Sequence, residues 1–367
     1  MKRRDILKGM GVAAAAAGLA ACQPRNAGTV AGPATGDGVR LQWKMVTSWP
    51  THFPGLGTGA ARLAEQITRA SGGRITVRVF GSGELVPPFE VFDAVSRGTA
   101  EIGHTAAYYW RGKAAAAPFF CAVPFGLNAQ EMDGWLRFGG GLELWRELYA
   151  PFKLVPFAAG NTGVQLAGWF RRPIAGVGDL RGLRMRIPGL GGDVIARLGA
   201  VPVNLPGAEI FSSLQSGAID AAEWVGPYND LAFGLHRVAG FAYYPGWQEP
   251  GATLEAIVHK PAFDALPEDL KAIVEACCAA ENDAMLAEYT ARNQQALDTL
   301  IREHGVQLRR LPDDVLAALR RAAEAVLEEL AAGDPFARRA YDSMRAFRAQ
   351  AQAWHTVSEE AFFQARR

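Results

Sequence analysis

An acid beside an aromatic residue near the middle of the chain forms the first candidate ligand site. Residues 218–222 are apolar enough for a short strand, which would deliver Glu223 and Trp224 to its end, just before the breaker Gly226-Pro227. An acid and an aromatic side chain at a strand end suit a small-ligand pocket. The same residues also fit an exposed loop acid next to a half-buried tryptophan, so both interpretations stay open.

Arg186 is the candidate for holding a carboxylate. It lies on an expected short strand, residues 184–188, just before a glycine-rich turn. The planar guanidinium matches a carboxylate at two points. Arg184 shares the same strand face and is the rival, and from residue type alone a surface ion pair is favoured over a ligand contact.

Gln165 and Glu223 are candidate ligands of a cation. Amide and carboxylate oxygens without His or Cys suit Na⁺ or Ca²⁺ and not zinc or copper. The two residues are far apart in the chain, so the sequence alone does not show that they meet. Other side chains that could hydrogen-bond or enclose a ligand are Asn161, Asn229, Tyr108, Tyr109, Trp110 and Trp224.

Nucleotide binding and the common catalytic motifs are not supported. The run GLGTG at 55–59 follows a strand, but it has the spacing GxGxG and no acidic ribose partner, so NAD is rejected. The sequence has no GxSxG elbow, no Walker loop and no HExxH. A net charge of +1 over 367 residues gives no reason to expect nucleic acid as a partner.

The N-terminus is expected to be an export signal. Arg3-Arg4 precedes a short alanine-rich apolar run at 11–21, which indicates the twin-arginine type. Leu19-Ala20-Ala21-Cys22 looks like a lipobox that would make Cys22 a lipidated N-terminus, and ordinary cleavage with an incidental cysteine is the alternative. The Gly/Pro-rich residues 23–38 predict a flexible linker.

Strands and helices alternate over the first two-thirds of the chain, which predicts parallel α/β sheets. Expected strands are 41–47, 75–80, 102–106, 154–159, 164–171, 201–205 and 254–259. A loop over 48–59 should precede a helix over 60–70. From 268 to 303 the chain is almost unbroken helix former, about 54 Å of helix, which could brace two domains or pair with a second chain. A strand-like 306–311 and helices over 313–332 and 335–365 follow.

Two runs carry a family resemblance, LRGLRMR at 180–186 and EIFSSLQSGAID at 209–220. They resemble the extracytoplasmic solute receptors of tripartite ATP-independent periplasmic (TRAP) transporters, the C4-dicarboxylate-binding superfamily. The resemblance extends from Trp43 to beyond Trp354. Within the superfamily the chain looks most like the 2-oxoacid-binding branch, through TSWPTHFPGLGTGA, FEVFDAVSRGTAEIGH, PFAAGNTGVQLAGWF and EWVGPYNDLAFG.

This resemblance implies a two-lobed α/β solute-binding fold with hinge strands and a long helix spanning both lobes. Arg186 matches the arginine that holds the ligand carboxylate. A cation, Na⁺ or Ca²⁺, is implied to bridge the ligand to Gln165 and Glu223, with the backbone carbonyl of Trp224 as a third protein ligand. Gln248, in GWQEPG, stands where a histidine is expected, which leaves the size of the substrate open.

The expected division follows from the same resemblance. Its parts are an export signal at 1–22, a linker at 23–38, lobe 1 mainly at 39–158, lobe 2 mainly at 159–253, a return through the hinge at 254–267, and the long helix with C-terminal helices at 268–367. Close relatives pair through swapped C-terminal helices, which implies a homodimer.

The expected function is a non-enzymatic receptor of the periplasm that captures a pyruvate-like 2-oxo monocarboxylate for TRAP permease subunits. A 2-hydroxy acid such as lactate, or a C4-dicarboxylate, is the alternative ligand. An exported carboxylate lyase or hydrolase is the alternative class, and it would need a general base that the sequence does not supply beyond Glu223.

Overall fold

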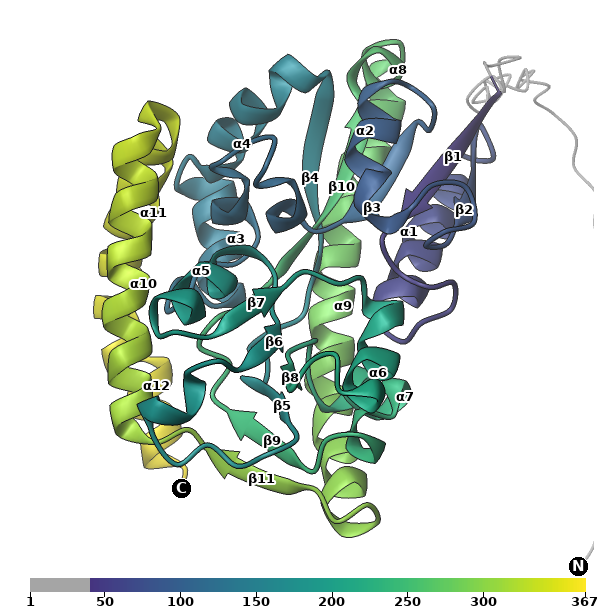
Figure 1. Cartoon of the computed structure of the whole chain (residues 1–367). Coiled ribbons are helices and arrows are strands. Elements are labelled where there is room, and N and C mark those ends of the chain that lie inside the picture. The colour runs from purple at the N-terminus through teal and green to yellow at the C-terminus, as the bar shows by residue number, and fades with distance from the viewer. Residues whose placement is uncertain (1–39) are drawn as a thin grey trace, which may run out of the picture. The chain divides into compact units, whose positions relative to one another are not determined.

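The computed structural model describes residues 40–367, so the expected export signal, Cys22 and the linker lie outside the described residues. The described part contains two sheets (Figure 1). One has five strands in the order β2-β1-β3-β10-β4, and the other has six in the order β11-β9-β5-β8-β6-β7. We call the first sheet with its helices lobe 1, and the second with its helices lobe 2.

Lobe 1 is built around a fully buried central strand. Its strands are β1 (Leu41–Thr47), β2 (Ile75–Phe80), β3 (Ile102–Thr105), β4 (Leu154–Asn161) and β10 (Thr253–His259). β1 is parallel to β2 and β3, but β10 is antiparallel to both of its neighbours, β3 and β4. Because every residue of β10 up to Val258 is buried, its apolar side chains lie in the core on both faces of the sheet.

The strands of lobe 2 are shorter. They are β5 (Gly168–Phe170), β6 (Arg184–Arg186), β7 (Val201–Val203), β8 (Ala221–Ala222), β9 (Phe241–Tyr244) and β11 (Gln307–Arg310). β6 is parallel to β7 and β8, whereas β5 is antiparallel to β8 and β9. β11 pairs with β9, so the C-terminal part of the chain also contributes a strand to lobe 2.

The expectation of parallel sheets is therefore wrong for part of each sheet. β5 and β10 are the first strands after the chain crosses from one lobe to the other. A strand that arrives from the other lobe is not led back by a helical crossover, so it is free to run antiparallel to its neighbours.

One helix, α9 (Glu268–Arg302), spans both lobes (Figure 1). It packs on β4 and α1 in lobe 1 and on α7 in lobe 2. Its bounds confirm the long helix expected at 268–303. The other helices are α1 (Leu56–Ala70), α2 (Val91–Ser96), α3 (Ala129–Phe138), α4 (Gly141–Tyr149) and α8 (Lys260–Asp264) in lobe 1, and α5 (Gly189–Arg197), α6 (Gly207–Ser216) and α7 (Pro227–Phe233) in lobe 2.

The C-terminal helices run along the side of the molecule away from α9 (Figure 1). α10 (Asp313–Gly333) packs on α5, and α11 (Pro335–Val357) packs on α3 and α4. α12 (Glu359–Ala365) follows a break at Ser358, so the single helix expected over 335–365 is wrong at that point. Short 3₁₀ helices lie at Pro88–Glu90, Ala107–Trp110, Ala117–Phe120, Ala150–Phe152, Val177–Leu180 and Leu235–Arg237.

Two local expectations are wrong for reasons of tertiary structure. α1 begins at Leu56 and not at residue 60. The glycines of this stretch lie in its first turn, and at Gly57 a Cβ would lie 2.3 Å from the Pro50 carbonyl oxygen, so glycine there allows close packing and does not mark a loop. The strand expected at 164–171 is reduced to β5, since the residues before it connect the lobes. The expected breaker Gly226-Pro227 does separate β8 from the next helix, and Pro227 begins α7, where a proline lacks only an N–H that would be unpaired anyway.

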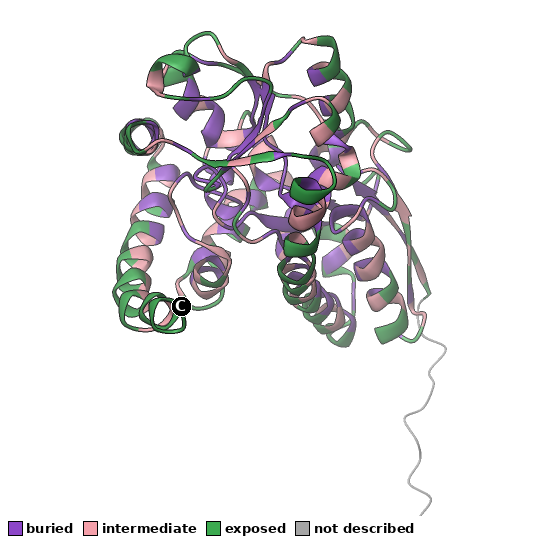
Figure 2. Cartoon of the chain, turned by 90° about the horizontal axis from the view of Figure 1, so that it is seen from below, coloured by how far each residue is buried: buried purple, intermediate pink, exposed green. Residues whose placement is uncertain are grey.

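Buried residues concentrate on the strands, and exposed residues on the outer helix faces (Figure 2). The three described cysteines, Cys121, Cys277 and Cys278, are free and buried. Within residues 40–367, no helix combines the length and the apolar character needed to cross a membrane.

Candidate functional site

Arg186 and Glu223 meet where two parallel strands of lobe 2 end. Arg186 closes β6 and pairs in register with Ala222 of β8, so Glu223 follows directly beside it. Arg186 Nη1 donates to the Glu223 carboxylate and, at 2.9 Å, to the Glu223 carbonyl oxygen. Arg186 is 1% exposed and Glu223 0%, so the charge pair is buried. This edge of a sheet, outside the carboxyl ends of its strands, is where α/β proteins bind ligands.

Arg184 lies outside this buried group. Its guanidinium forms a two-point ion pair with Asp220, with nitrogen–oxygen distances of 3.0 and 2.8 Å, and its side chain is 45% exposed. Arg184 therefore forms the surface ion pair that the sequence allowed, and Arg186 remains the candidate for binding a ligand carboxylate.

The two connections between the lobes bring further polar side chains to this group. Residues 162–167 lead from β4 to β5, and residues 245–252 lead from β9 to β10. They run side by side, since the Gln165 N–H donates to the Glu249 carbonyl oxygen at 3.2 Å. Gln165 Nε2 donates to Glu249 Oε2 at 2.9 Å, and Gln248 Nε2 donates to the Leu166 carbonyl oxygen at 2.8 Å. All three side chains are buried.

Tyr108 contributes from lobe 1. It lies on the 3₁₀ helix Ala107–Trp110, and α5 of lobe 2 begins against it at Gly189. Gly189 has a φ of +60°, and a Cβ there would lie 3.1 Å from the Tyr108 Cβ. Tyr108 is therefore placed where the two lobes touch, next to the polar group.

Several buried polar atoms of this group are unsatisfied. Within residues 40–367, no hydrogen-bond partner is found for Gln165 Oε1, Arg186 Nη2, Glu223 Oε2 and Gln248 Oε1. Buried polar groups are nearly always hydrogen-bonded, so four exceptions in one place call for a ligand. One guanidinium donor and three oxygens are complementary to a carboxylate together with a cation.

The oxygens also decide which kind of cation fits. Among the described residues, no group of three or more His, Cys, Asp or Glu side chains could hold a metal ion. A zinc or copper site is thus not formed by those residues. Amide and carboxylate oxygens from Gln165 and Glu223 fit a hard cation such as Na⁺ or Ca²⁺, with other oxygens supplied by backbone, ligand or water.

The electrostatics of the group favour added positive charge. Burial raises the pKa of Glu223, and the Arg186 guanidinium opposes that rise. Burial also raises the pKa of Glu249, and the negative charge of Glu223 adds to the effect. Arg186 is the one buried arginine or lysine in the described part of the chain, so two carboxyl groups share one guanidinium.

Trp224 forms an aromatic wall between the lobes. The Arg186 guanidinium carbon lies 5.1 Å from the centre of its ring. Phe53 of lobe 1 and Phe233 of α7 lie 6.2 and 5.1 Å away, measured between ring centres. The sequence-based prediction that Trp224 could wall a pocket is compatible with this position.

Asn161 and Asn229 are both buried, and their amides are occupied by protein partners. Asn161 donates to the Thr253 hydroxyl at 3.1 Å. It also donates to the Gly251 carbonyl oxygen at 3.3 Å and accepts from the Gly163 N–H at 2.9 Å, which ties the two connections together. Asn229 Nδ2 donates to the Pro54 carbonyl oxygen at 2.7 Å, and its Oδ1 accepts from the Tyr289 hydroxyl at 2.6 Å. Their predicted contact with a ligand stays a prediction.

Sequence reasoning did not single out Glu249 or Phe53. A signal for Glu249 was present, because GWQEPG places an acid between glycines and a proline in a segment that returns to lobe 1. Phe53 had no signal, since only the closed arrangement of the lobes brings it to Trp224.

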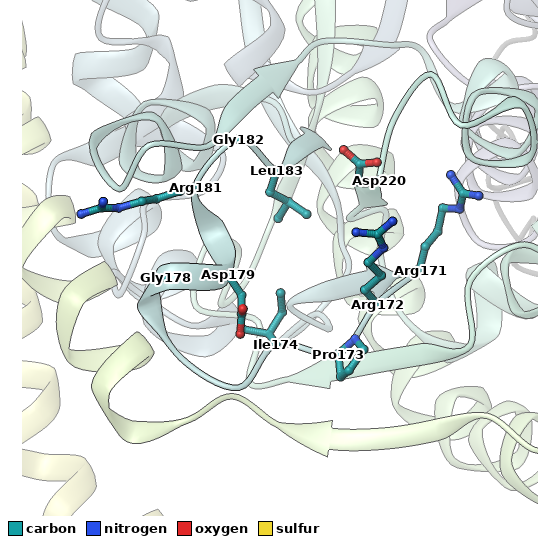
Figure 3. Close-up of a pocket in the computed structure, with 10 residues that line it drawn as sticks. All are labelled: Arg171, Arg172, Pro173, Ile174, Gly178, Asp179, Arg181, Gly182, Leu183 and Asp220. Atoms are coloured by element: carbon teal, nitrogen blue, oxygen red, sulfur yellow. The ribbon is translucent and has the colours of Figure 1, made fainter.

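A separate pocket of about 490 Å³ lies at the other end of the lobe 2 sheet (Figure 3). Asp220 and Leu183 line it, and they precede β8 and β6, whereas Arg186 ends β6 and Glu223 follows β8. Figure 3 shows Arg172 beside Asp220 and Arg181 turned away from them. None of the side chains proposed above as ligand contacts lines this pocket.

The chain is similar to known solute-binding proteins. The family described as bacterial extracellular solute-binding protein, family 7, matches residues 45–334. Over 362 residues the chain is 42% identical to the monocarboxylate 2-oxoacid-binding periplasmic protein of Nostoc sp., covering 99% of this chain and 98% of that protein.

Two crystal structures resemble the fold closely. A TRAP solute-binding protein from Bordetella bronchiseptica, a mixed-occupancy dimer with calcium and picolinate in one active site, has a TM-score of 0.87 and 38% identity, covering 89% of this chain and 97% of that one. A TRAP periplasmic solute-binding protein from Pseudoalteromonas atlantica, with bound sodium and pyruvate, has a TM-score of 0.86 and 38% identity, covering 89% and 99%.

Proposed function

The chain belongs to family 7 of the bacterial extracellular solute-binding proteins and is a TRAP solute-binding protein, and we propose that it captures a 2-oxo monocarboxylate such as pyruvate together with Na⁺ or Ca²⁺. Proteins of this type bind small carboxylates and work with membrane permease components. The pyruvate, picolinate and cations in the similar crystal structures support the choice of ligand.

The observation that carries the proposal is the set of unsatisfied buried atoms. Arg186 Nη2 is a free donor for the ligand carboxylate. Gln165 Oε1 and Glu223 Oε2 are free acceptors for a cation. The Trp224 carbonyl would be the third protein ligand, as the family resemblance implies. When bound, the cation supplies positive charge that a carboxylate oxygen and the adjacent 2-oxo oxygen can share.

Charge favours a monocarboxylate over a dicarboxylate. Two buried carboxyl groups, Glu223 and Glu249, already face a single buried cationic side chain. A second carboxylate on the ligand would add negative charge without a second guanidinium to pair with it, which is costly away from water. Lactate offers the cation an equivalent pair of oxygens, so lactate is the ligand that must be compared with pyruvate. Gln248 and Tyr108 would line the remaining space around the ligand.

Binding without turnover is part of the proposal. A general base must be free to accept a proton at the reacting atom. Glu223 is the acid nearest Arg186, and one of its oxygens accepts from that guanidinium. The other would hold the cation. We expect the pyruvate concentration to stay constant in the presence of the protein.

The deciding experiment measures thermal unfolding of the mature, dialysed protein. Pyruvate, lactate and succinate are each added with Na⁺, with Ca²⁺ or with a chelator. Pyruvate at 100 times its dissociation constant should stabilise the protein by about 2.7 kcal/mol, and only with a cation. Glu223→Ala should abolish that shift, whereas Glu255→Ala, which removes an equally buried acid of lobe 1, should keep it. A cation-independent shift with succinate instead would refute the proposal.

Assembly and location complete the proposal. Large apolar side chains are exposed at the C-terminal end, namely Trp354, Val357, Phe362 and Phe363. A second copy that covers them would form a homodimer through the C-terminal helices.

The division into lobes at 39–158, 159–253 and 254–267 is likewise proposed. The family supports a periplasmic location. Export by the twin-arginine route and a lipid anchor at Cys22 are proposed from the sequence alone.

A further inference from the structure

We propose that Glu249 is a positioning residue that turns the amide oxygen, and not the amide nitrogen, of Gln165 toward the cation. The inference rests on the proposed function, because it concerns how one expected ligand of the cation is held. A glutamine amide has ends of nearly the same shape, but only its oxygen can bind a cation. Something in the structure must therefore decide which end faces the site.

Two neighbours bind the nitrogen end of Gln165. Nε2 donates to Glu249 Oε2 at 2.9 Å and to Thr162 Oγ1 at 3.0 Å. The Thr162 hydroxyl donates its own proton to the Gly163 carbonyl oxygen at 3.0 Å, so toward Gln165 it can only accept. The Glu249 oxygen accepts too while its carboxyl group is ionised, the form that the Arg186 guanidinium favours. With the amide reversed, its oxygen would face these two acceptors and its nitrogen would face the cation.

The backbone holds this arrangement in place. The Gln165 N–H donates to the Glu249 carbonyl oxygen at 3.2 Å, so the two residues are joined by main chain as well as by side chain. Both lie on the connections between the lobes and are at most 5% exposed. Outer groups of this kind fix the orientation of metal ligands, and their loss costs about 10- to 100-fold in metal affinity.

The test is calorimetric titration of Ca²⁺ into the dialysed full-length mature protein with excess pyruvate. Glu249→Ala should weaken Ca²⁺ binding at least about tenfold. Glu249→Gln keeps an oxygen that can accept from Gln165, so it should restore most of the affinity. In a Gln165→Ala background, Glu249→Ala should add less than about a twofold further loss, because the residue acts through Gln165.

Other results of these titrations would contradict the proposal. An undiminished effect of Glu249→Ala in the Gln165→Ala background would show that Glu249 acts by charge or by general structure, and the proposal would fall. Glu249→Gln binding as weakly as Glu249→Ala would overturn it too. If the unchanged protein binds neither Ca²⁺ nor Na⁺ with pyruvate, the proposed function fails and this inference fails with it.

A second pair of variants keeps the test decisive if Glu249→Ala does not fold. Thr162→Val removes the other acceptor of the Gln165 amide and should also weaken Ca²⁺ binding. Thr253→Val is its matched control, because Thr253 is a buried threonine that bonds Asn161 and not Gln165. Equal effects of the two threonine variants would contradict the proposal.

Discussion

At the scale of single residues, the Arg186–Glu223 pair combines near-complete burial with incomplete hydrogen bonding. Removing one member of a buried pair leaves the other charge uncompensated, at a cost of about 3–5 kcal/mol. A conservative substitution is therefore the cleaner probe, because it keeps the charge and changes only the geometry of recognition.

Arg186→Lys should reduce pyruvate affinity by roughly 30-fold or more, since an ammonium cannot replace the two-point contact of a guanidinium. Arg184→Lys is the control, because it alters an exposed pair on the same strand and should change affinity by less than about twofold. Calorimetry at saturating Ca²⁺ measures both. Similar losses in the two variants would argue against Arg186 as the carboxylate contact.

The buried carboxyl group of Glu255 makes the free energy of unfolding depend on pH. It accepts hydrogen bonds from Trp110 Nε1 and the Tyr149 hydroxyl, and burial raises its pKa from 4.5 to about 8. Between these values the folded protein keeps a proton that the unfolded chain has lost. The free energy of unfolding therefore falls as pH rises through this window, by up to about 1.4 kcal/mol per unit.

Glu255→Gln should remove that contribution, so its stability relative to the unchanged protein should improve steadily from pH 5 to pH 8. Urea unfolding at each pH is the measurement, with Glu303→Gln as an exposed control. A difference in stability that is independent of pH would contradict the assignment.

Sequence reasoning at this scale identified side chains but not their partners. The two-point chemistry of Arg186 and the hard oxygens of Gln165 and Glu223 can be read from residue types. The contact of Gln165 with Glu249 joins residues far apart in the chain, and only the folded connections bring them together.

At the scale of elements, the sequence predicts long helices and strands well and very short ones poorly. The 35 residues of α9 carry many turns of consistent helix formers, so its bounds were predicted almost to the residue. β8 has two residues and β6 has three, and such strands exist only because neighbouring strands bond to them. No local pattern marks elements of that kind.

α7 also provides a direct contact between lobes, through Asn229 and the Pro54 carbonyl oxygen. Asn229→Ala should weaken pyruvate and lactate binding by the same factor, about 5-fold or more, because it destabilises the closed arrangement and not one ligand. Asn293→Ala is the control, since Asn293 joins α7 to α9 without touching lobe 1 through the Pro54 loop. Loss for one ligand alone would instead indicate that Asn229 contacts the ligand.

At the scale of the whole molecule, the structure shows the lobes in contact. Arg111 of lobe 1 forms an ion pair with Asp193 of α5, and Phe53 of lobe 1 packs against Phe233 of α7 with 4.2 Å between ring centres. The polar group around Arg186 and Glu223 is itself almost fully buried. Entry of a ligand therefore requires the lobes to separate about the two connections.

The C-terminal surface gives a prediction about assembly. Phe362→Glu with Phe363→Glu should convert the proposed dimer to a monomer, because charge replaces exposed apolar side chains at a surface that a second copy would cover. Leu85→Glu changes an exposed apolar residue of lobe 1 and should leave the mass unchanged. Light scattering during size-exclusion chromatography measures the mass, and a monomeric unchanged protein would refute the dimer.

The surroundings of Trp224 affect its fluorescence. Its indole ring lies against a guanidinium from the site and against a phenylalanine from the opposite lobe. Separation of the lobes would remove the phenylalanine, and a bound carboxylate would draw on the guanidinium. Because indole emission responds to both kinds of neighbour, opening and filling of the site each alter the light that Trp224 emits, and the protein reports its own state without an added label.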